Sequence, residues 1–335
     1  MQTEKKNNKS LKTPKKIAIT GINSFIGSNL ARRLANNPGY QLVAIDIKKP
    51  GFLEKNVKFY HIDITEPMVD AVIARIFKKE KIDELVHLAF LSSPIKNTSL
   101  SHELEVIGTL NIIHAASTIK LKKFLLKSTT MVYGANATNP ALLTEEYPLT
   151  ADSGMEYLKD KIEVEHIVKR FSEKNPDTTV TILRHCTIMG PTVKNFMTSY
   201  LASPAVLTIL GFDPLFQFTH EEDIINVFRI AIEDNYPGVF NIVGRGALPF
   251  STILKLAGKL RIPIPYPIAY SMVSMLWSAN LLPVPPAFLN FLKYACIADG
   301  ARAKKVMKFK ARYTIKETLE SFMGTQRLRE LRLAE

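Results

Sequence analysis

Short apolar, β-branched segments alternate with amphipathic segments along the first two thirds of the chain. The apolar segments predict strands, and apolar residues at helical spacing predict helices between them. The alternation is typical of an α/β fold with a doubly wound parallel sheet and helices on both faces. The expected strands are 16–20, 41–46, 57–61, 84–88, 123–128, 179–183 and 239–243, and the expected helices are about 25–36, 68–79, 102–117 and 154–171.

Beyond about Gly190 the pattern loosens into proline-rich, apolar stretches, which indicates a smaller C-terminal substrate-binding region. Two stretches in it, 195–212 and 262–292, carry no charged residue. Prolines interrupt the second one, so no piece reaches the ~20 residues of a membrane-spanning helix. We expect a basic disordered tail over 1–15, a Rossmann domain over 16–189 with a return segment about 217–245, a substrate-binding region over 190–216 and 246–325, and a basic C-terminal tail over 326–335.

Charge is concentrated at the two ends of the chain. The 335 residues carry a formal net charge of +13, yet 1–16 hold six lysines and one glutamate, and 301–335 hold ten basic and four acidic residues. A nearly neutral body does not suit nucleic acid, which needs a basic face on the fold itself. Basic ends suit either a solvated tail or contact with an anionic membrane surface. Two cysteines, Cys186 and Cys296, fit a reducing compartment, so we expect a cytoplasmic protein, with peripheral membrane contact left open.

The turn after the first expected strand has the composition of a dinucleotide-binding loop. Gly21 leaves the strand, and Gly27 stands where the next helix packs closely on it. Ser24 takes the place of the usual middle glycine. The N-terminus of that helix would offer N–H groups and a positive dipole end to a pyrophosphate. A plain strand-to-helix turn is the alternative.

Two aspartates follow at positions suited to an adenosine. Asp46 ends the second expected strand, where a carboxylate accepts both ribose hydroxyls and repels a 2′-phosphate. This favours NAD over NADP, although Lys48 and Lys49 come directly afterwards. Asp63, after the third strand, is placed to meet the adenine edge. Each aspartate taken alone is equally typical of a turn or a helix cap.

A tyrosine, a lysine and a threonine form the candidate catalytic set. Tyr157 and Lys161 are four residues apart on an expected helix, so their side chains share one face. A nearby ammonium group favours the phenolate, so we expect Lys161 to lower the pKa of Tyr157. Thr129 ends the fifth strand, and ligands of doubly wound sheets lie beyond the carboxyl ends of the strands. Proton exchange by Tyr157 could then accompany hydride transfer.

With these residues the chain resembles the extended short-chain dehydrogenase/reductase family, also called the NAD-dependent epimerase/dehydratase family, over about 16–245. The resemblance implies Thr129, Tyr157 and Lys161 as catalytic residues. It implies a cofactor site made of Gly21, Ser24, Phe25, Ile26, Gly27, Asp46, Asp63, Ile64, Leu88, Ala89 and Lys161. Further matches to the family's motifs are His87-Leu88-Ala89, Arg184 with Gly190-Pro191, His220 with Asp223, and Asn241.

The chain also departs from the family pattern. Glu105 stands where the family often has an asparagine, and His185 and Thr187 replace a proline and an asparagine. Phe216 stands where sugar-nucleotide members carry an arginine, four residues before the histidine of the His-x-x-Asp motif. A diphosphate-linked sugar would lose an anchor without that cation, which weakens the case for a UDP-sugar.

We therefore predict an NAD-dependent oxidoreductase that transfers a hydride between the cofactor and a secondary alcohol or ketone of an apolar substrate, such as a lipid, sterol or acyl compound. Two alternatives stay open: an epimerase or dehydratase of a nucleotide sugar, and a dinucleotide-binding scaffold without turnover. His220 and Asp223 lack a third ligand at metal spacing, so no metal is expected. Nucleic acid is not an expected partner, and a homodimer stays open because helix-pair dimers are common in the resembling family.

Overall fold

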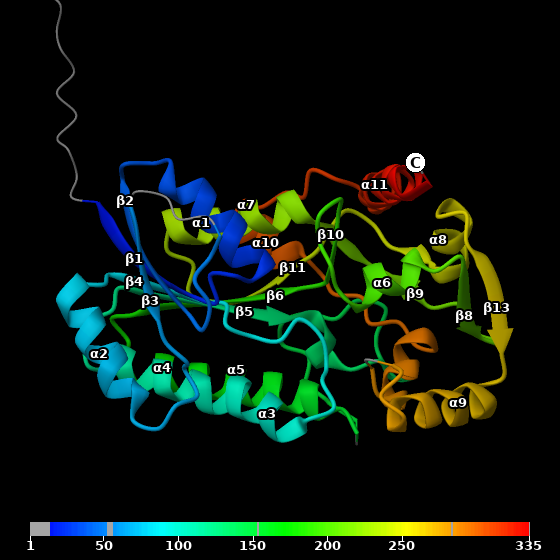
Figure 1. Cartoon of the computed structure of the whole chain (residues 1–335), viewed down its shortest axis with the longest axis horizontal. Helices are drawn as coiled ribbons and strands as arrows, with labels where there is room; N and C mark the ends of the chain where they lie inside the picture. Colours follow the sequence, from blue (N-terminus) through cyan, green and yellow to red (C-terminus); the bar gives the residue numbers. More distant parts are fainter. Residues whose placement is uncertain (1–13, 52–55, 153, 283, 335) are drawn as a thin grey trace, which may run out of the picture.

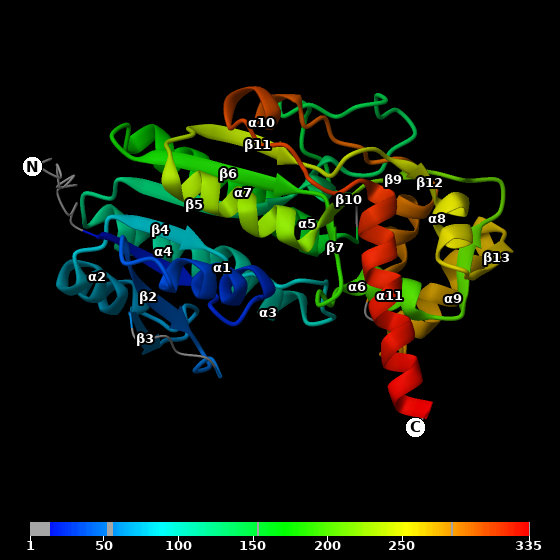
Figure 2. The same cartoon turned by 90° about the horizontal axis from the view of Figure 1, so that it is seen from above.

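The computed structural model describes residues 14–51, 56–152, 154–282 and 284–334, with side chains as far as 328. Most of the predicted N-terminal tail lies outside these residues. The predicted C-terminal tail is instead the end of a helix, because α11 runs from Ile315 to Ala334. Figures 1 and 2 show an elongated molecule with the large sheet at one end and the C-terminal region at the other.

A seven-stranded sheet forms the centre of the larger part. All its strands are parallel, in the order β11-β6-β5-β4-β1-β2-β3. The crossover after β3 divides the order into two halves, so the carboxyl ends of β1 and β4 lie at the switch point where ligands bind in such sheets. The predicted doubly wound α/β fold is confirmed. The strands are β1 Lys15–Thr20, β2 Tyr40–Asp46, β3 Val57–His61, β4 Glu84–His87, β5 Lys123–Thr129, β6 Thr179–His185 and β11 Gly238–Ile242.

Helices cover both faces of this sheet, and each face has its own apolar core (Figure 1). One core joins β1, β5 and β6 to α1 (Phe25–Ala35), α7 (Glu221–Glu233) and α10 (Ala301–Val306). The other joins the opposite face to α2 (Val69–Glu80), α4 (Gly108–Ser117) and α5 (Glu156–Lys174). Burial on both faces explains why the strands are continuously apolar rather than alternating.

Two boundaries differ from the prediction for local reasons. The helix expected at 102–117 begins earlier, as α3 (Thr98–His102), and passes through a π-helical turn, η1 (Glu103–Ile107), before α4. The side chain of Asn97 caps α3 by accepting from Leu100 N–H. β6 is two residues longer than expected because Arg184 and His185 pair with β5 and β11.

The C-terminal region packs around a third apolar core, built from segments that are far apart in sequence. No helix among the described residues is long and apolar enough to cross a membrane. The strands of this region are β7 Thr187–Met189, β8 Ala205–Ile209, β9 Leu215–Phe216, β10 Phe218–His220, β12 Leu248–Pro249 and β13 Leu260–Ile264. Its helices are α6 Phe196–Ala202, α8 Phe250–Leu256, α9 Tyr266–Ser278, the 3-10 helix η3 Pro286–Leu292, and α11.

Candidate active site

The loop between β1 and α1 is shaped by its two glycines. Gly21 has a φ of +71°, and a Cβ there would lie 2.6 Å from the backbone nitrogen of Ala89. A Cβ on Gly27 would lie 2.3 Å from the carbonyl oxygen of Gly21. Only glycine allows this close approach. Ser24, which replaces the usual glycine, caps α1 by accepting from Gly27 N–H.

Asp46 lies at the end of β2 and faces this loop. Its carboxylate accepts from the backbone N–H of Asn23 at 3.0 Å and of Lys48 at 3.2 Å. An acid beside a glycine loop and a helix N-terminus fits a dinucleotide ribose and disfavours a 2′-phosphate. Asp63, by contrast, accepts from the backbone and hydroxyl of Thr65.

A pocket of about 320 Å³, here called the sheet-edge pocket, opens beyond the carboxyl ends of β1, β5 and β6. It brings together six predicted site residues: Ser24, Phe25, Ile26, Thr129, Tyr157 and Lys161. In the part of the chain that the structure describes, its other lining residues are Asn23, Phe90, Leu91, Ser92, Pro94, Lys127, Ser128, Met131, His185, Thr187, Ile188, Val193, Lys194, Asn195 and Phe196. Gly21, Gly27, Asp46, Asp63, Ile64, Leu88 and Ala89 are not among these lining residues.

Three polar side chains project from one face of the sheet into this pocket. Thr129 of β5 lies opposite His185 of β6 in the strand register. Lys127 is two residues before Thr129, so its side chain points to the same face. Sequence reasoning had not assigned a role to Lys127 or His185. A lysine directly after the three apolar residues of β5 was the available signal.

Lys161 is held by a buried ion pair. Its Nζ lies 2.6 Å from Oε2 of Glu105, and both side chains are almost fully buried. The other carboxylate oxygen of Glu105 accepts from the backbone N–H of Leu91 at 2.8 Å. Glu105 therefore fixes the lysine and the loop after β4 together. Its place in the π-helical turn η1 aims the carboxylate at α5, and such turns are frequent at functional sites.

The predicted effect of Lys161 on Tyr157 is wrong for this arrangement. Burial, and then the negative charge of Glu105, raise the pKa of Tyr157 well above its ordinary value. Glu105 offsets the positive charge of Lys161, whose ammonium lies 5.0 Å from the centre of the tyrosine ring. The phenol donates to the carbonyl oxygen of Leu91 at 3.3 Å. Tyr157 is thus a protonated group, suited to donate a proton.

Lys127 and His185 are held as neutral or easily deprotonated bases. Burial, and then the charge of Lys161, lower the pKa of Lys127 to about 7. Burial lowers the pKa of His185 to about 3. The Nδ1 of His185 contacts the carbonyl oxygen of Cys186 at 2.8 Å, so Nδ1 carries the proton and Nε2 is an acceptor. Nε2 is buried and has no hydrogen-bond partner among the described residues.

Several residues of the family motifs hold the fold together. Arg184 forms a buried, bidentate ion pair with Glu165, which also accepts from Ser128. The amide of Asn241 accepts from Tyr133 and donates to Leu143 and Asp299 carbonyl oxygens. These contacts tie β6 and β11 to the segments that follow β5.

His220 and Asp223 also have structural contacts. His220 stacks on Tyr313 with ring centres 3.7 Å apart, and Asp223 accepts from the backbone N–H groups of Arg312 and Tyr313. They therefore anchor the segment leading into α11. The described residues contain no group of three or more His, Cys, Asp or Glu side chains that could hold a metal ion.

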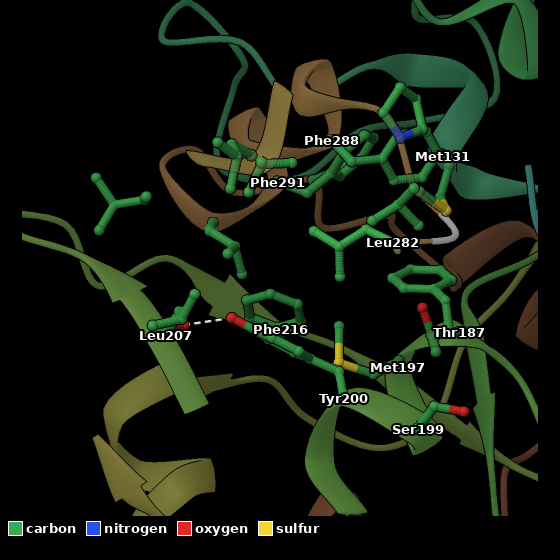
Figure 3. A pocket seen from close by; sticks show the side chains of 18 of the residues that line it. Met131, Thr187, Met197, Ser199, Tyr200, Leu207, Phe216, Leu282, Phe288 and Phe291 are labelled. Carbon is green, nitrogen blue, oxygen red and sulfur yellow. Dashed lines mark hydrogen bonds between the residues drawn. The ribbon is translucent and has the colours of Figure 1, made fainter. Parts of the chain in front are cut away.

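A second cavity of about 330 Å³, here called the C-terminal cavity, lies between the large sheet and α9 (Figure 3). None of its described lining residues is charged. Two of its polar side chains bond within the protein: the Tyr200 hydroxyl donates to Leu207 O, and Gln217 bonds the backbone of Ala298. Its lining residues are Thr130, Met131, Cys186, Thr187, Phe196, Met197, Ser199, Tyr200, Ser203, Leu207, Ile209, Leu215, Phe216, Gln217, Ala269, Val273, Leu282, Val284, Pro285, Phe288, Leu289, Phe291, Leu292 and Cys296.

The two cavities adjoin, because Met131, Thr187 and Phe196 line both. The two cavities therefore share part of their walls. Cys186 lies in the cavity wall, and burial raises the pKa of its thiol to about 11, as expected for an unreactive cysteine.

Known sequences match this chain over shares that range from about half to nearly all of its length. An uncharacterised protein of Mycobacterium tuberculosis (strain ATCC 25618 / H37Rv) is 28% identical over 92% of this chain and 83% of its own length. A UDP-glucose 4-epimerase of Bacillus subtilis (strain 168) is 26% identical over 64% of this chain and 70% of its own. A UDP-glucose 4-epimerase 2 of Oryza sativa subsp. japonica is 26% identical over 59% of this chain and 54% of its own.

Solved structures share the fold over nearly the whole chain. A UDP-glucose 4-epimerase of Thermotoga maritima with UDP-glucose has a TM-score of 0.73 at 19% identity, covering 94% of this chain and 99% of that one. A UDP-glucuronic acid 4-epimerase of Bacillus cereus in complex with NAD has a TM-score of 0.72 at 21% identity, with the same coverage.

A family model of the NAD-dependent epimerases and dehydratases matches residues 17–243. NAD is the cofactor of that family, so the prediction of NAD is confirmed at the family level. The match includes the glycine loop, Asp46 and the predicted catalytic set, and it ends just after β11, before β12, α8, β13 and α9. The chain belongs to the NAD-dependent epimerase/dehydratase family.

Proposed function

We propose that this protein is an NAD-dependent enzyme that oxidises or reduces a secondary alcohol or ketone carbon of an apolar small molecule. The observation that carries the proposal is that a pocket with ionisable side chains shares a wall with a cavity that has no charged side chain among its described lining residues. The sheet-edge pocket holds the hydroxyl, phenol and amines, and the C-terminal cavity has an uncharged, mainly aromatic and aliphatic lining. Such a lining excludes water and favours an apolar ligand.

In this proposal the glycine loop and Asp46 hold the dinucleotide, which supplies or accepts a hydride when it is bound. Tyr157 donates a proton to the substrate oxygen in the reducing direction and takes it back in the oxidising direction. Thr129 orients the same oxygen by a hydrogen bond. Lys161, fixed by Glu105, keeps a positive charge beside the phenol. These roles require Thr129 and Tyr157 to face one ligand, and both line the sheet-edge pocket.

The distribution of charge supports an apolar substrate in this proposal. A nucleotide sugar carries two phosphate charges, which proteins usually bind with arginine or lysine. Phe216 lines the C-terminal cavity and stands where sugar-nucleotide members of the resembling family carry an arginine. None of the described residues that line this cavity is cationic. Burial of an aliphatic or ring-shaped group against these walls would instead contribute roughly 25 cal/mol per Å².

The second candidate is epimerisation or dehydration of a nucleotide sugar. It is supported by the curated relatives and by the structures of similar fold, several of which act on or contain UDP-sugars. The sequence matches to those epimerases cover 52–64% of this chain, and the structural matches are below 25% identical. These similarities favour the second candidate on family grounds, and the apolar lining of the C-terminal cavity favours the first.

A parallel assay separates the candidates. The purified protein with NAD is offered sterols, isoprenoid alcohols and long-chain 3-hydroxyacyl compounds in one set, and UDP-glucose and UDP-glucuronic acid in the other. Net NADH fluorescence with an apolar alcohol supports the proposal. Sugar isomers detected by mass spectrometry without net NADH support the second candidate instead. Mass spectrometry of small molecules released from the protein identifies any retained cofactor and lipid in the same preparation.

A further inference from the structure

The helix α9 presents apolar side chains to solvent. Ile268 and Met275 are seven residues apart, on one face, and are 59% and 65% exposed. Leu281, just past the helix, is 71% exposed, and Tyr270 is 43% exposed. Only Ala269 and Val273 of this 13-residue helix are buried.

The neighbouring strand extends this apolar surface. In β13, Leu260 and Ile262 are exposed, and this strand pairs with β8 alone. The helix α9 begins two residues after the end of β13, so the two elements are neighbours (Figure 1). We call this surface, made of Leu260, Ile262, Ile268, Tyr270, Met275 and Leu281, the α9 surface. Several large apolar side chains exposed on one helix and on the strand that leads into it are typical of a surface that binds something.

The α9 surface covers the C-terminal cavity. Ala269 and Val273 point inward from the same helix and line that cavity, and Leu282 and Val284 line it just beyond the helix. The outer face of α9 thus meets solvent while its inner face forms a wall of the apolar cavity. A lipid that lay against the outer face would be one helix diameter from the proposed substrate site.

The segment that contains the α9 surface carries only basic charge, and one acidic side chain from outside it, Asp152, lies near the start of α9, where it accepts from Asn290, the partner of the Tyr266 hydroxyl. Residues 235–298 include five basic residues and no aspartate or glutamate. Lys293 lies 3.9 Å from the ring centre of Tyr266 at the start of α9, and Lys96 donates to the carbonyl oxygen of Ser278 at its end. Arg261, in β13, bonds Thr208. Cations therefore flank the apolar surface at both ends of α9, which complements anionic lipid headgroups.

We propose that the α9 surface docks on an anionic lipid bilayer, with Ile268 and Met275 entering the interface and Lys96, Arg261 and Lys293 contacting headgroups. This is the geometry of an interfacial helix, which lies in the membrane plane with its apolar face inserted. The inference rests on the proposed function in one respect: docking here would place the C-terminal cavity next to the bilayer, from which an apolar substrate could enter it.

The test is co-sedimentation of the full chain with vesicles of phosphatidylcholine and phosphatidylserine in a roughly 7:3 ratio. The double variant Ile268→Glu/Met275→Glu should lower the bound fraction at least tenfold. Leu142→Glu, at an exposed apolar position far from α9 in sequence, is the matched control and should bind as the parent does. Binding should also weaken with pure phosphatidylcholine and with added salt, because exposed charges are screened.

Three results would overturn the inference: no binding of the parent protein, binding that survives the double variant, or a double variant that only converts a dimer to a monomer in sedimentation without vesicles. Unchanged thermal unfolding and NAD binding of the double variant would show that it folds. The readout is independent of turnover. Vesicle binding without any apolar substrate being turned over would leave docking intact and refute the proposed function alone.

Discussion

The two cavities of this protein are close in space and opposite in chemistry. The sheet-edge pocket is lined by groups that move or hold protons, several of them buried and paired, as in the contact between Lys161 and Glu105. The C-terminal cavity has a similar volume, and its described walls hold no charge. The first is built mainly from the ends of sheet strands, α5 and the segment 187–196, and the second mainly from elements after β6, with Thr130 and Met131 completing its wall.

This difference indicates that the sheet-edge pocket and the C-terminal cavity have separate roles, proton transfer in the first and substrate binding in the second. Buried ionisable groups are costly, and a chain retains them where their chemistry is used. An apolar cavity stabilises any ligand of suitable shape but performs no proton transfer. We therefore expect changes in the sheet-edge pocket to alter turnover and ionisation, and changes in the C-terminal cavity to alter substrate affinity.

The largest expected effect is on turnover. Tyr157→Phe removes the proposed acid, so kcat with a substrate found in the parallel assay should fall about 10²- to 10⁴-fold. Affinity for NAD, measured by calorimetry, should stay within about twofold because the glycine loop and Asp46 are untouched. Tyr270→Phe, on the exposed side of α9, is the control and should leave kcat unchanged. Retained turnover in Tyr157→Phe would refute the proposed mechanism.

The next effect is on stability. Glu105→Gln leaves the buried Lys161 without its partner charge, and breaking such pairs costs about 3–5 kcal/mol of unfolding free energy. Without Glu105 the folded-state pKa of Lys161 falls further below its unfolded value, so the unfolded chain binds more protons. The deficit should therefore shrink as pH rises from 7 towards 10.

Urea unfolding at pH 7 and at pH 9.5 measures this change. The control is Glu163→Gln, an exposed position on α5, the helix that also carries Lys161. It should change the free energy of unfolding by less than about 0.5 kcal/mol. A deficit that grows with pH would contradict the ion-pair account. A loss of the same size in the control would place the effect in the helix rather than in the pair.

A smaller effect is expected in the C-terminal cavity. Ala269 is buried in α9 and lines the cavity, so Ala269→Phe fills part of the space. The KM for an apolar substrate should rise about tenfold, equivalent to about 1.4 kcal/mol, with kcat nearly unchanged. Ala279→Phe, exposed just after α9, is the control. An unchanged KM would mean that the substrate does not occupy this cavity.

The smallest effect concerns Lys127. The pKa of Lys127 is about 7 in the folded protein and 10.5 in the unfolded chain. The charged lysine therefore lowers the free energy of unfolding fully below pH 7, and this loss disappears as pH rises towards 10.5. Lys127→Met should raise stability by about 1 kcal/mol at pH 6.5, since partial exposure screens the charge. The gain should vanish near pH 10. Thermal unfolding at both pH values tests this, with exposed Lys169→Met as control; a gain independent of pH would indicate packing alone.

Much of the fold was predictable because hydrophobic periodicity is local. β3 was predicted at its observed bounds, and the other predicted strands of the large sheet differ by one or two residues at their ends. The family could be inferred from Gly21, Gly27 and the spacing of Tyr157 and Lys161, since these constraints act within one turn or one helix. Lys127, by contrast, directly follows the three apolar residues of β5, and only its neighbours in space identify it as a pocket residue.

The sequence by itself determined the order of strands and helices, the glycine loop and the positions of the candidate acid and amine. Only the tertiary structure determined which charged side chains contact one another. Glu105 and Lys161 are 56 residues apart and form an ion pair, and burial, followed by the charge of Glu105, reverses the expected shift in the pKa of Tyr157. Electrostatic effects depend on distance in space and on burial, and neither quantity can be read along the chain. For the same reason, the apolar cavity beside the sheet emerged only once separate segments had packed together.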